Sequence, residues 1–229
     1  MRRSRKYLDK LQKLGSVRTP LDPGSALEML KSISREWESI DLDVRLGINT
    51  RKADQNIRGT TILPKGTGRT PRVLVLCKAD KAEEAKEAGA DYTGLEDMIE
   101  KIEGGWLEFD MVIATPDVMK LASKVAKILG PRGLMPNPKS GTVTMDVKSA
   151  VNECKAGKVE YRADKTGIIH TTVGRASFPV EDLRENLEHL MGVLVKARPA
   201  TVKGQYVKSV YVSSTQSPSL KLDVGSFTS

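Results

Sequence analysis

The first twenty residues carry the side chains whose chemistry is clearest, because seven cations there oppose one carboxylate. The cations are Arg2, Arg3, Arg5, Lys6, Lys10, Lys13 and Arg18, and the carboxylate is Asp9. Guanidinium and ammonium groups in such a cluster bind phosphate oxygens and release condensed counterions. A solubilising tail is the alternative interpretation. Four apolar side chains in this segment have the spacing of one helix face, which favours a docked basic helix: Tyr7, Leu8, Leu11 and Leu14.

Metal and nucleotide chemistry find no support in the remaining motifs. Neither the two cysteines nor the two histidines have the spacing of metal ligands: Cys77, Cys154, His170 and His189. The segment 66–70 is rich in glycine, but a phosphate-binding loop needs GxxxxGK[ST] between a strand and a helix. Arg69 stands where the lysine should be. We therefore expect no metal and no cofactor.

The acidic residues in the middle of the chain are arranged as a solvated helix surface. Those in 83–87 and 96–100 are interspersed with lysines at the spacing of exposed helices. No nucleophile elbow and no Ser/His/Asp constellation is present. We expect that the protein is not an enzyme. The alternative is an enzyme in the middle segment that binds a small ligand at the carboxyl ends of its strands.

Charge is distributed unevenly along the 229 residues, whose formal net charge is +8. Residues 1–58 carry +5, residues 59–156 carry zero and residues 157–229 carry +3. Basic ends favour a polyanionic partner. The string that marks a base-stacking RNA-recognition domain is absent, so recognition of RNA backbone and shape is expected. The apolar runs are far shorter than the roughly 18–20 residues that span a bilayer, so no membrane partner is expected.

The two ends of the chain show the apolar alternation of half-buried strands. Strands are expected at 40–48, 59–63, 159–163, 168–173, 207–213 and 220–223. The turn at Asp22-Pro23-Gly24-Ser25 predicts a helix over 26–37, and Phe178-Pro179 leads into another helix whose apolar face runs from Leu183 to Leu194.

The middle of the chain shows continuous apolar strands that alternate with helices. Strands are expected at 73–76, 109–114 and 142–144, and helices at 80–88, 93–103, 116–129 and 147–155. This alternation is typical of a parallel sheet covered on both faces. We therefore expect an α/β protein in which a discontinuous α+β split domain, 1–66 plus 157–229, contains an inserted doubly wound α/β domain, 67–156. Two linkers near 64–71 and 155–158 would allow hinge motion.

One long segment resembles a known family. Residues 128–143, ILGPRGLMPNPKSGTV, are similar to the signature of the large-subunit ribosomal protein L-one family. Further matches are DQNIRGT at 54–60, AGADY at 88–92, ATPDVM at 114–119, KAGKVEYR at 155–162 and DKTGIIH at 164–170. The resemblance covers nearly the whole chain and is strongest over 51–178.

The resemblance implies a structural protein of the large ribosomal subunit with a split RNA-binding domain. It implies binding to the folded rRNA of the mobile stalk beside the exit site for deacylated tRNA, and assistance in tRNA release. It also implies repression of the protein's own mRNA, as in bacterial members. A ribosome of a bacterial cytoplasm or of an organelle such as a plastid is expected, and a monomer outside the ribosome. The alternative is a non-ribosomal RNA-binding protein of the same fold.

The candidate RNA-binding residues come from the basic start and from the family's contact positions. Arg2, Arg3, Arg5 and Lys6 are expected at phosphates, Trp37 against a ribose or base, and Lys165, Thr166 and His170 as donors. Ser213, Ser214 and Thr215 are expected to form a platform where RNA comes close. The family has an acidic residue, a Lys-Phe pair and a Thr-Met-Gly turn where this chain has Ser25, Glu36-Trp37 and Thr215-Gln216-Ser217. Ser217 is less able than glycine to adopt positive φ.

Overall fold

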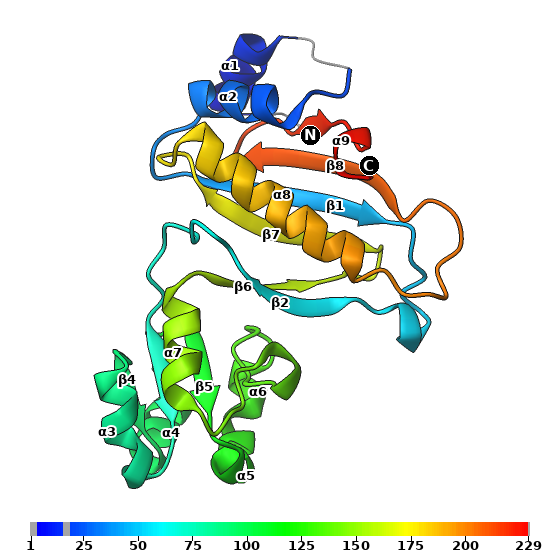
Figure 1. Cartoon of the computed structure of the whole chain (residues 1–229). Helices are drawn as coiled ribbons and strands as arrows, with labels where there is room; N and C mark the ends of the chain where they lie inside the picture. The colour runs from blue at the N-terminus through cyan, green and yellow to red at the C-terminus, as the bar shows by residue number, and fades with distance from the viewer. Residues whose placement is uncertain (1–3, 16–18, 229) are drawn as a thin grey trace. The chain divides into compact units, whose positions relative to one another are not determined.

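The chain forms two compact units that it crosses between twice. A computed structural model describes residues 4–15 and 19–228. Unit 1 consists of Met1–Gly68 and Val159–Ser229, and unit 2 of Arg69–Lys158 (Figure 1). Each unit has its own sheet and core. No helix in the described ranges is long and apolar enough to cross a membrane.

Unit 1 is built on an antiparallel sheet with the strand order β7-β1-β8-β9. Its strands are β1 (Ser39–Leu46), β7 (Ile168–Arg175), β8 (Val207–Ser214) and β9 (Leu220–Leu222). Along β1, every second side chain from Ile40 to Leu46 is buried, as the alternation predicts. A separate two-stranded sheet pairs β2 (Arg58–Ile62) with β6 (Lys158–Arg162), and the short helix η1 (Ala53–Gln55) precedes β2.

Helices pack on the apolar face of this sheet. They are α2 (Pro23–Ile33) and α8 (Val180–Lys196), with α1 (Arg5–Leu14) beside α2 and a final turn α9 (Gly225–Thr228). Figure 1 shows α8 lying along the sheet. The predicted helix over 26–37 is too long, because Ser34 is extended and its hydroxyl donates to the Leu30 carbonyl at 2.6 Å. Such a side-chain bond competes with helix propagation.

Unit 2 contains a parallel sheet with the order β4-β3-β5, covered on both faces. Its strands are β3 (Val73–Leu76), β4 (Tyr92–Gly94) and β5 (Met111–Ala114). Val73 and Val75 pack toward α3 (Ala79–Glu87) and α7 (Val147–Lys155). Leu74 and Leu76 pack with α4 (Glu96–Glu103) and the turns after β5. The doubly wound arrangement is therefore confirmed.

Three predicted elements of unit 2 differ in the structure. The helix expected from Thr93 begins only at Glu96, because Tyr92–Gly94 forms the edge strand β4. The helix expected over 116–129 is a series of short turns, η2 (Pro116–Val118), α5 (Met119–Ala122), η3 (Ser123–Val125) and α6 (Ala126–Leu129). The Ser123 hydroxyl donates to the Lys120 carbonyl at 2.6 Å and interrupts the regular pattern. The strand expected at 142–144 is a single bridge between Ala114 and Val143, after the turn η4 (Pro138–Ser140).

Candidate nucleic-acid interface

The net charge of the protein lies on unit 1. Its sequence holds 23 Lys and Arg against 15 Asp and Glu, whereas unit 2 holds 14 of each. The difference of eight accounts for the whole net charge. Four of the unit 1 carboxylates lie in the first three turns of α8: Glu181, Asp182, Glu185 and Glu188. The start of α8 therefore offers little to a polyanion, and the open face of the sheet, the ends of its strands and α1 hold the candidate contacts.

The open face of the sheet carries the side chains that alternate with those of the core. Most are polar or charged on β1, β7 and β8, and they include Asp43, Arg45, His170, Ser209 and Tyr211. These five, with Ile168 and Ser219, line a shallow pocket of about 360 Å³. His170 is exposed here, with its Nδ1 2.6 Å from the Asp43 carboxylate and its Nε2 3.9 Å from that of Asp164. Its Nε2 is the ring atom with no hydrogen bond among the described residues.

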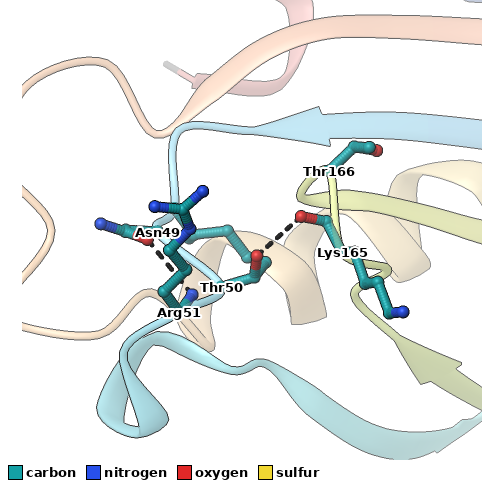
Figure 2. A pocket seen from close by; sticks show the side chains of 6 residues that line it. Asn49, Thr50, Arg51, Lys165 and Thr166 are labelled. Carbon is teal, nitrogen blue, oxygen red and sulfur yellow. Dashed lines mark hydrogen bonds between the residues drawn. The ribbon is translucent and has the colours of Figure 1, made fainter.

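A basic pocket lies where β1 ends, between the β1–β2 connection and the β6–β7 turn (Figure 2). It has a volume of about 530 Å³ and is lined by Ile48, Asn49, Thr50, Arg51, Lys165 and Thr166. A second hollow of about 370 Å³ shares Thr50 and Lys165 and adds Arg162. The Thr50 hydroxyl donates to the Lys165 carbonyl at 2.7 Å, which joins the two loops. Within the described ranges, no ion pair neutralises Arg51, Arg162 or Lys165.

Asp164 organises the turn that presents Lys165. Its carboxylate accepts the backbone N–H of Ile168 at 2.7 Å and that of Thr166 at 2.8 Å. The bond from the Ile168 N–H is the largest of the causes that lower the pKa of Asp164. The Thr166 hydroxyl donates to the same carboxylate at 2.7 Å, so its proton is engaged within the protein. Thr166, expected as a donor, therefore offers an incoming group its hydroxyl lone pairs.

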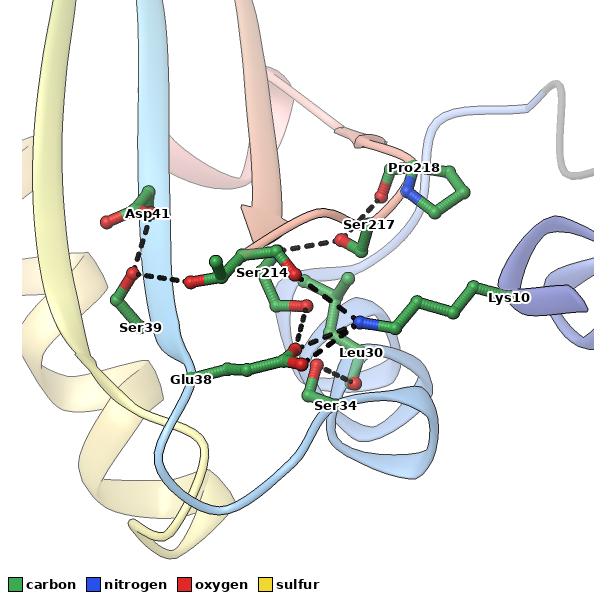
Figure 3. Close-up of polar contacts among 10 residues, drawn as sticks. Lys10, Leu30, Ser34, Glu38, Ser39, Asp41, Ser214, Ser217 and Pro218 are labelled. Atoms are coloured by element: carbon green, nitrogen blue, oxygen red, sulfur yellow. Dashed lines mark hydrogen bonds and ion pairs between the residues drawn. The ribbon is translucent and has the colours of Figure 1, made fainter. Parts of the chain in front are cut away.

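A strand-end cluster lies at the opposite end of β1, where β8 also ends (Figure 3). Ser39 and the exposed Thr215 approach within 3.2 Å through their hydroxyls, and Ser39 donates to Asp41 at 2.9 Å. Ser213 is partly exposed on the open face. Ser214 is buried and its hydroxyl donates to Glu38 at 3.2 Å. Of the three expected platform residues, Ser213 and Thr215 are therefore accessible, and the side chain of Ser214 points inward, contrary to the prediction.

The turn after β8 forms without the glycine that the family has at this position. The only positive φ at a non-glycine residue in the described ranges is that of Gln216, at 58°. Ser217 donates its N–H to the Ser214 carbonyl at 3.0 Å, and its hydroxyl accepts the Ser214 N–H at 2.8 Å. Ser217 therefore does not adopt the positive φ that glycine permits, and it closes the turn with its side chain.

The remaining candidates lie on the helices and on the loop before β1. Trp37 is 62% exposed, with the guanidinium of Arg35 5.8 Å from its ring centroid. Arg5 and Lys6 are exposed on α1. Arg2 and Arg3 lie outside the described residues. Ser25 and Glu36, at two positions where the family pattern changes, are exposed.

Sequence reasoning missed several members of the candidate interface. Arg51 lines the basic pocket and Arg162, at the end of β6, lines the adjoining hollow, and Lys165 lines both. Both residues could have been predicted from the sequence. Arg51 follows the strand expected at 40–48, Arg162 lies in the strand expected at 159–163, and each is next to or within a family motif. Leu8 was expected on the buried helix face but is 47% exposed, and Lys10 is the more buried of the two. The helical spacing of apolar residues alone did not show which of Leu8 and Lys10 is the more buried.

A basic split unit with cationic and hydroxyl-bearing side chains along one sheet defines a nucleic-acid-binding protein. No group of three or more His, Cys, Asp or Glu in the described part of the chain could hold a metal ion. Residues 28–218 match the family described as the Ribosomal protein L1p/L10e family, and the chain belongs to that family. It is therefore an rRNA-binding protein of the large ribosomal subunit. The match confirms the resemblance that the motifs indicated.

Proposed function

We propose that this protein is a structural component of the mobile stalk of the large subunit and holds folded rRNA through unit 1, the split domain predicted as 1–66 plus 157–229. The observation that carries the proposal is the location of the entire net charge of +8 on unit 1. Phosphate neutralisation supplies a large share of RNA affinity, so the basic unit is the one that binds.

The proposed RNA surface follows β1 from the strand-end cluster to the basic pocket. These lie roughly 23 Å apart at about 3.3 Å per residue, a distance that spans several phosphates of a folded strand. Arg51, Arg162 and Lys165 contact phosphates at one end. Thr215 and Ser213 present short side chains at the other, where RNA comes close. His170 lies between them and offers its Nε2.

The remaining candidates extend this surface. Arg5 and Lys6, with Arg2 and Arg3, contact phosphates, and the exposed ring of Trp37 packs against a ribose or base. Thr166 accepts from a ribose hydroxyl, and buried Ser214 supports the platform from behind.

Three further proposals depend on this RNA surface. Beside the exit site, the stalk protein would assist release of deacylated tRNA, with unit 2 free to swing about the two crossings. The same surface would bind a similar element in the protein's own mRNA and repress its translation. The protein would be a monomer outside a bacterial or organellar ribosome.

The test is the salt dependence of binding between the full chain and a stalk rRNA fragment. In the triple variant Arg51→Gln, Arg162→Gln and Lys165→Gln, the slope of log affinity against log salt should fall by about 2, because each phosphate contact contributes about 0.7–0.9. The matched control removes three exposed lysines from unit 2, Lys120→Gln, Lys124→Gln and Lys127→Gln. Equal losses of slope in the two variants would contradict the assignment of RNA binding to unit 1.

A further inference from the structure

The helix α1 lies outside the residues that match the family, yet it is docked on the strand-end cluster. The family match begins at residue 28, and α1 spans Arg5–Leu14. A helix of this length is marginal in water by itself. Its only buried side chain is that of Leu14. A specific contact must therefore add to the apolar packing that holds α1 in place.

Lys10 supplies that contact. Its ammonium lies 3.0 and 3.3 Å from the two carboxylate oxygens of Glu38 and donates to the Thr215 carbonyl at 3.4 Å (Figure 3). The side chains of Lys10 and Glu38 are 17% and 6% exposed. Removing one partner from an ion pair this buried leaves a charge without compensation, which is far more costly than the loss of a surface pair.

Glu38 is the junction of three segments. Its carboxylate receives Lys10 from α1 and the Ser214 hydroxyl from the end of β8. Its own backbone N–H donates to the Arg35 carbonyl, and its carbonyl accepts from Ala176 after β7. Glu38 therefore connects α1 with the ends of β7 and β8.

We propose that the Lys10–Glu38 ion pair is a latch that positions α1 as an RNA-binding arm of unit 1. Lys10 and Glu38 are positioning residues. The cations that contact phosphate are Arg5, Lys6 and Lys13, which are exposed on the latched helix. The partner is the backbone of the same RNA that lies on Thr215. The proposal rests on the function proposed above.

The sharpest test is Glu38→Gln in the full chain. From the change in net charge alone, Glu38→Gln should bind RNA more tightly than the parent, because the variant loses a carboxylate near a polyanion. The latch predicts weaker binding, because a released α1 no longer holds its three cations at the RNA. The slope of log affinity against log salt should fall by about 2 in Glu38→Gln and in Lys10→Met. Lys10→Arg should keep the parent slope.

The matched control is Lys13→Met, which removes one positive charge from the same helix and leaves the latch. Its slope should fall by less than 1. Hydrogen exchange of the free protein supplies a readout without RNA. The α1 amides should exchange faster in Glu38→Gln and Lys10→Met, with the β1 amides still protected as evidence that unit 1 is folded.

The outcomes separate the two proposals. Tighter or unchanged RNA binding by Glu38→Gln, with α1 exchange as in the parent, would overturn the latch. Absence of salt-dependent RNA binding by the parent chain would overturn the proposed function. In that case faster α1 exchange in the variants would still show the docking contact.

Discussion

Replacing Asn186 by leucine should destabilise unit 1 by about 4 kcal/mol. Asn186 lies on α8 and is fully buried. Its amide nitrogen donates to the carbonyls of Gly66 at 3.0 Å and Val173 at 2.9 Å, and its oxygen accepts the Lys65 N–H at 3.0 Å. It therefore fastens the first crossing segment to the sheet.

The magnitude follows from these three bonds. Each is worth about 0.5–1.5 kcal/mol net, and a buried carbonyl left without a donor costs about 1–3 kcal/mol. Val173 is buried, so its carbonyl carries that penalty, whereas water can reach the exposed backbone near Lys65. Leucine has the same branched skeleton as asparagine, so no cavity is left. The two bonds whose partners water can reach contribute about 1–3 kcal/mol together and the unpaired Val173 carbonyl about 1–3 kcal/mol, so the sum is roughly 2–6 kcal/mol.

The assay must observe each unit separately, because a chain with two units need not unfold in one step. Hydrogen exchange of the β1 and β7 amides reports unit 1. Fluorescence of Trp106, which packs edge-on against Tyr92 at 4.8 Å, reports unit 2. Urea should unfold unit 1 of Asn186→Leu at lower concentration and leave the Trp106 transition in place. A change below about 0.5 kcal/mol in unit 1 would refute the reasoning, because that is the range of neutral surface substitutions.

Two further predictions concern a hydroxyl and a carboxylate. The Thr171 hydroxyl is buried and has no hydrogen-bond partner among the described residues. Thr171→Val should therefore raise the free energy of unfolding, measured by urea titration, by about 1–2 kcal/mol. A lower free energy of unfolding in the variant would contradict this prediction. The pKa of Asp164 is lowered chiefly by the hydrogen bond from the Ile168 N–H. The ionised carboxylate should therefore stabilise the β6–β7 turn fully at pH values above the ordinary carboxyl pKa of about 4. This stabilisation should be lost as the pH falls below that value and through the lowered pKa of the folded state. NMR shifts of the Thr166 and Ile168 amides between pH 6 and 2 measure this, and Asp164→Asn, which cannot titrate, should show no such transition.

Much of the fold could be predicted because its signals are local. The alternation over 40–48 placed β1 within two residues, since one face of the strand must be apolar. The helix expected over 147–155 begins where α7 does, because Asp146 directly before it is a helix-capping residue whose carboxylate accepts the Ser149 N–H at 3.1 Å. The uniformly apolar strands of the middle predicted a sheet covered on both faces, as the two cores of unit 2 show.

The candidate site was predictable only in part, because its geometry depends on contacts between distant segments. Lys10 and Glu38 are 28 residues apart and each is unremarkable in its own segment. The basic pocket draws Arg51 and Lys165 from loops that only the folded sheet brings together. The Ser214 hydroxyl faces inward because the pleat of β8 turns it toward Glu38, which the family resemblance did not indicate.

The position of β1 in its sheet has a consequence for synthesis of the protein. Both strands that pair with β1 come after the whole of unit 2 in the chain. Domains generally fold as they emerge during translation. Unit 2 can therefore fold on a growing chain before β7 and β8, the strands that pair with β1, have been made. The sheet of unit 1, and with it the proposed RNA surface, can therefore be completed only after β8 has been made.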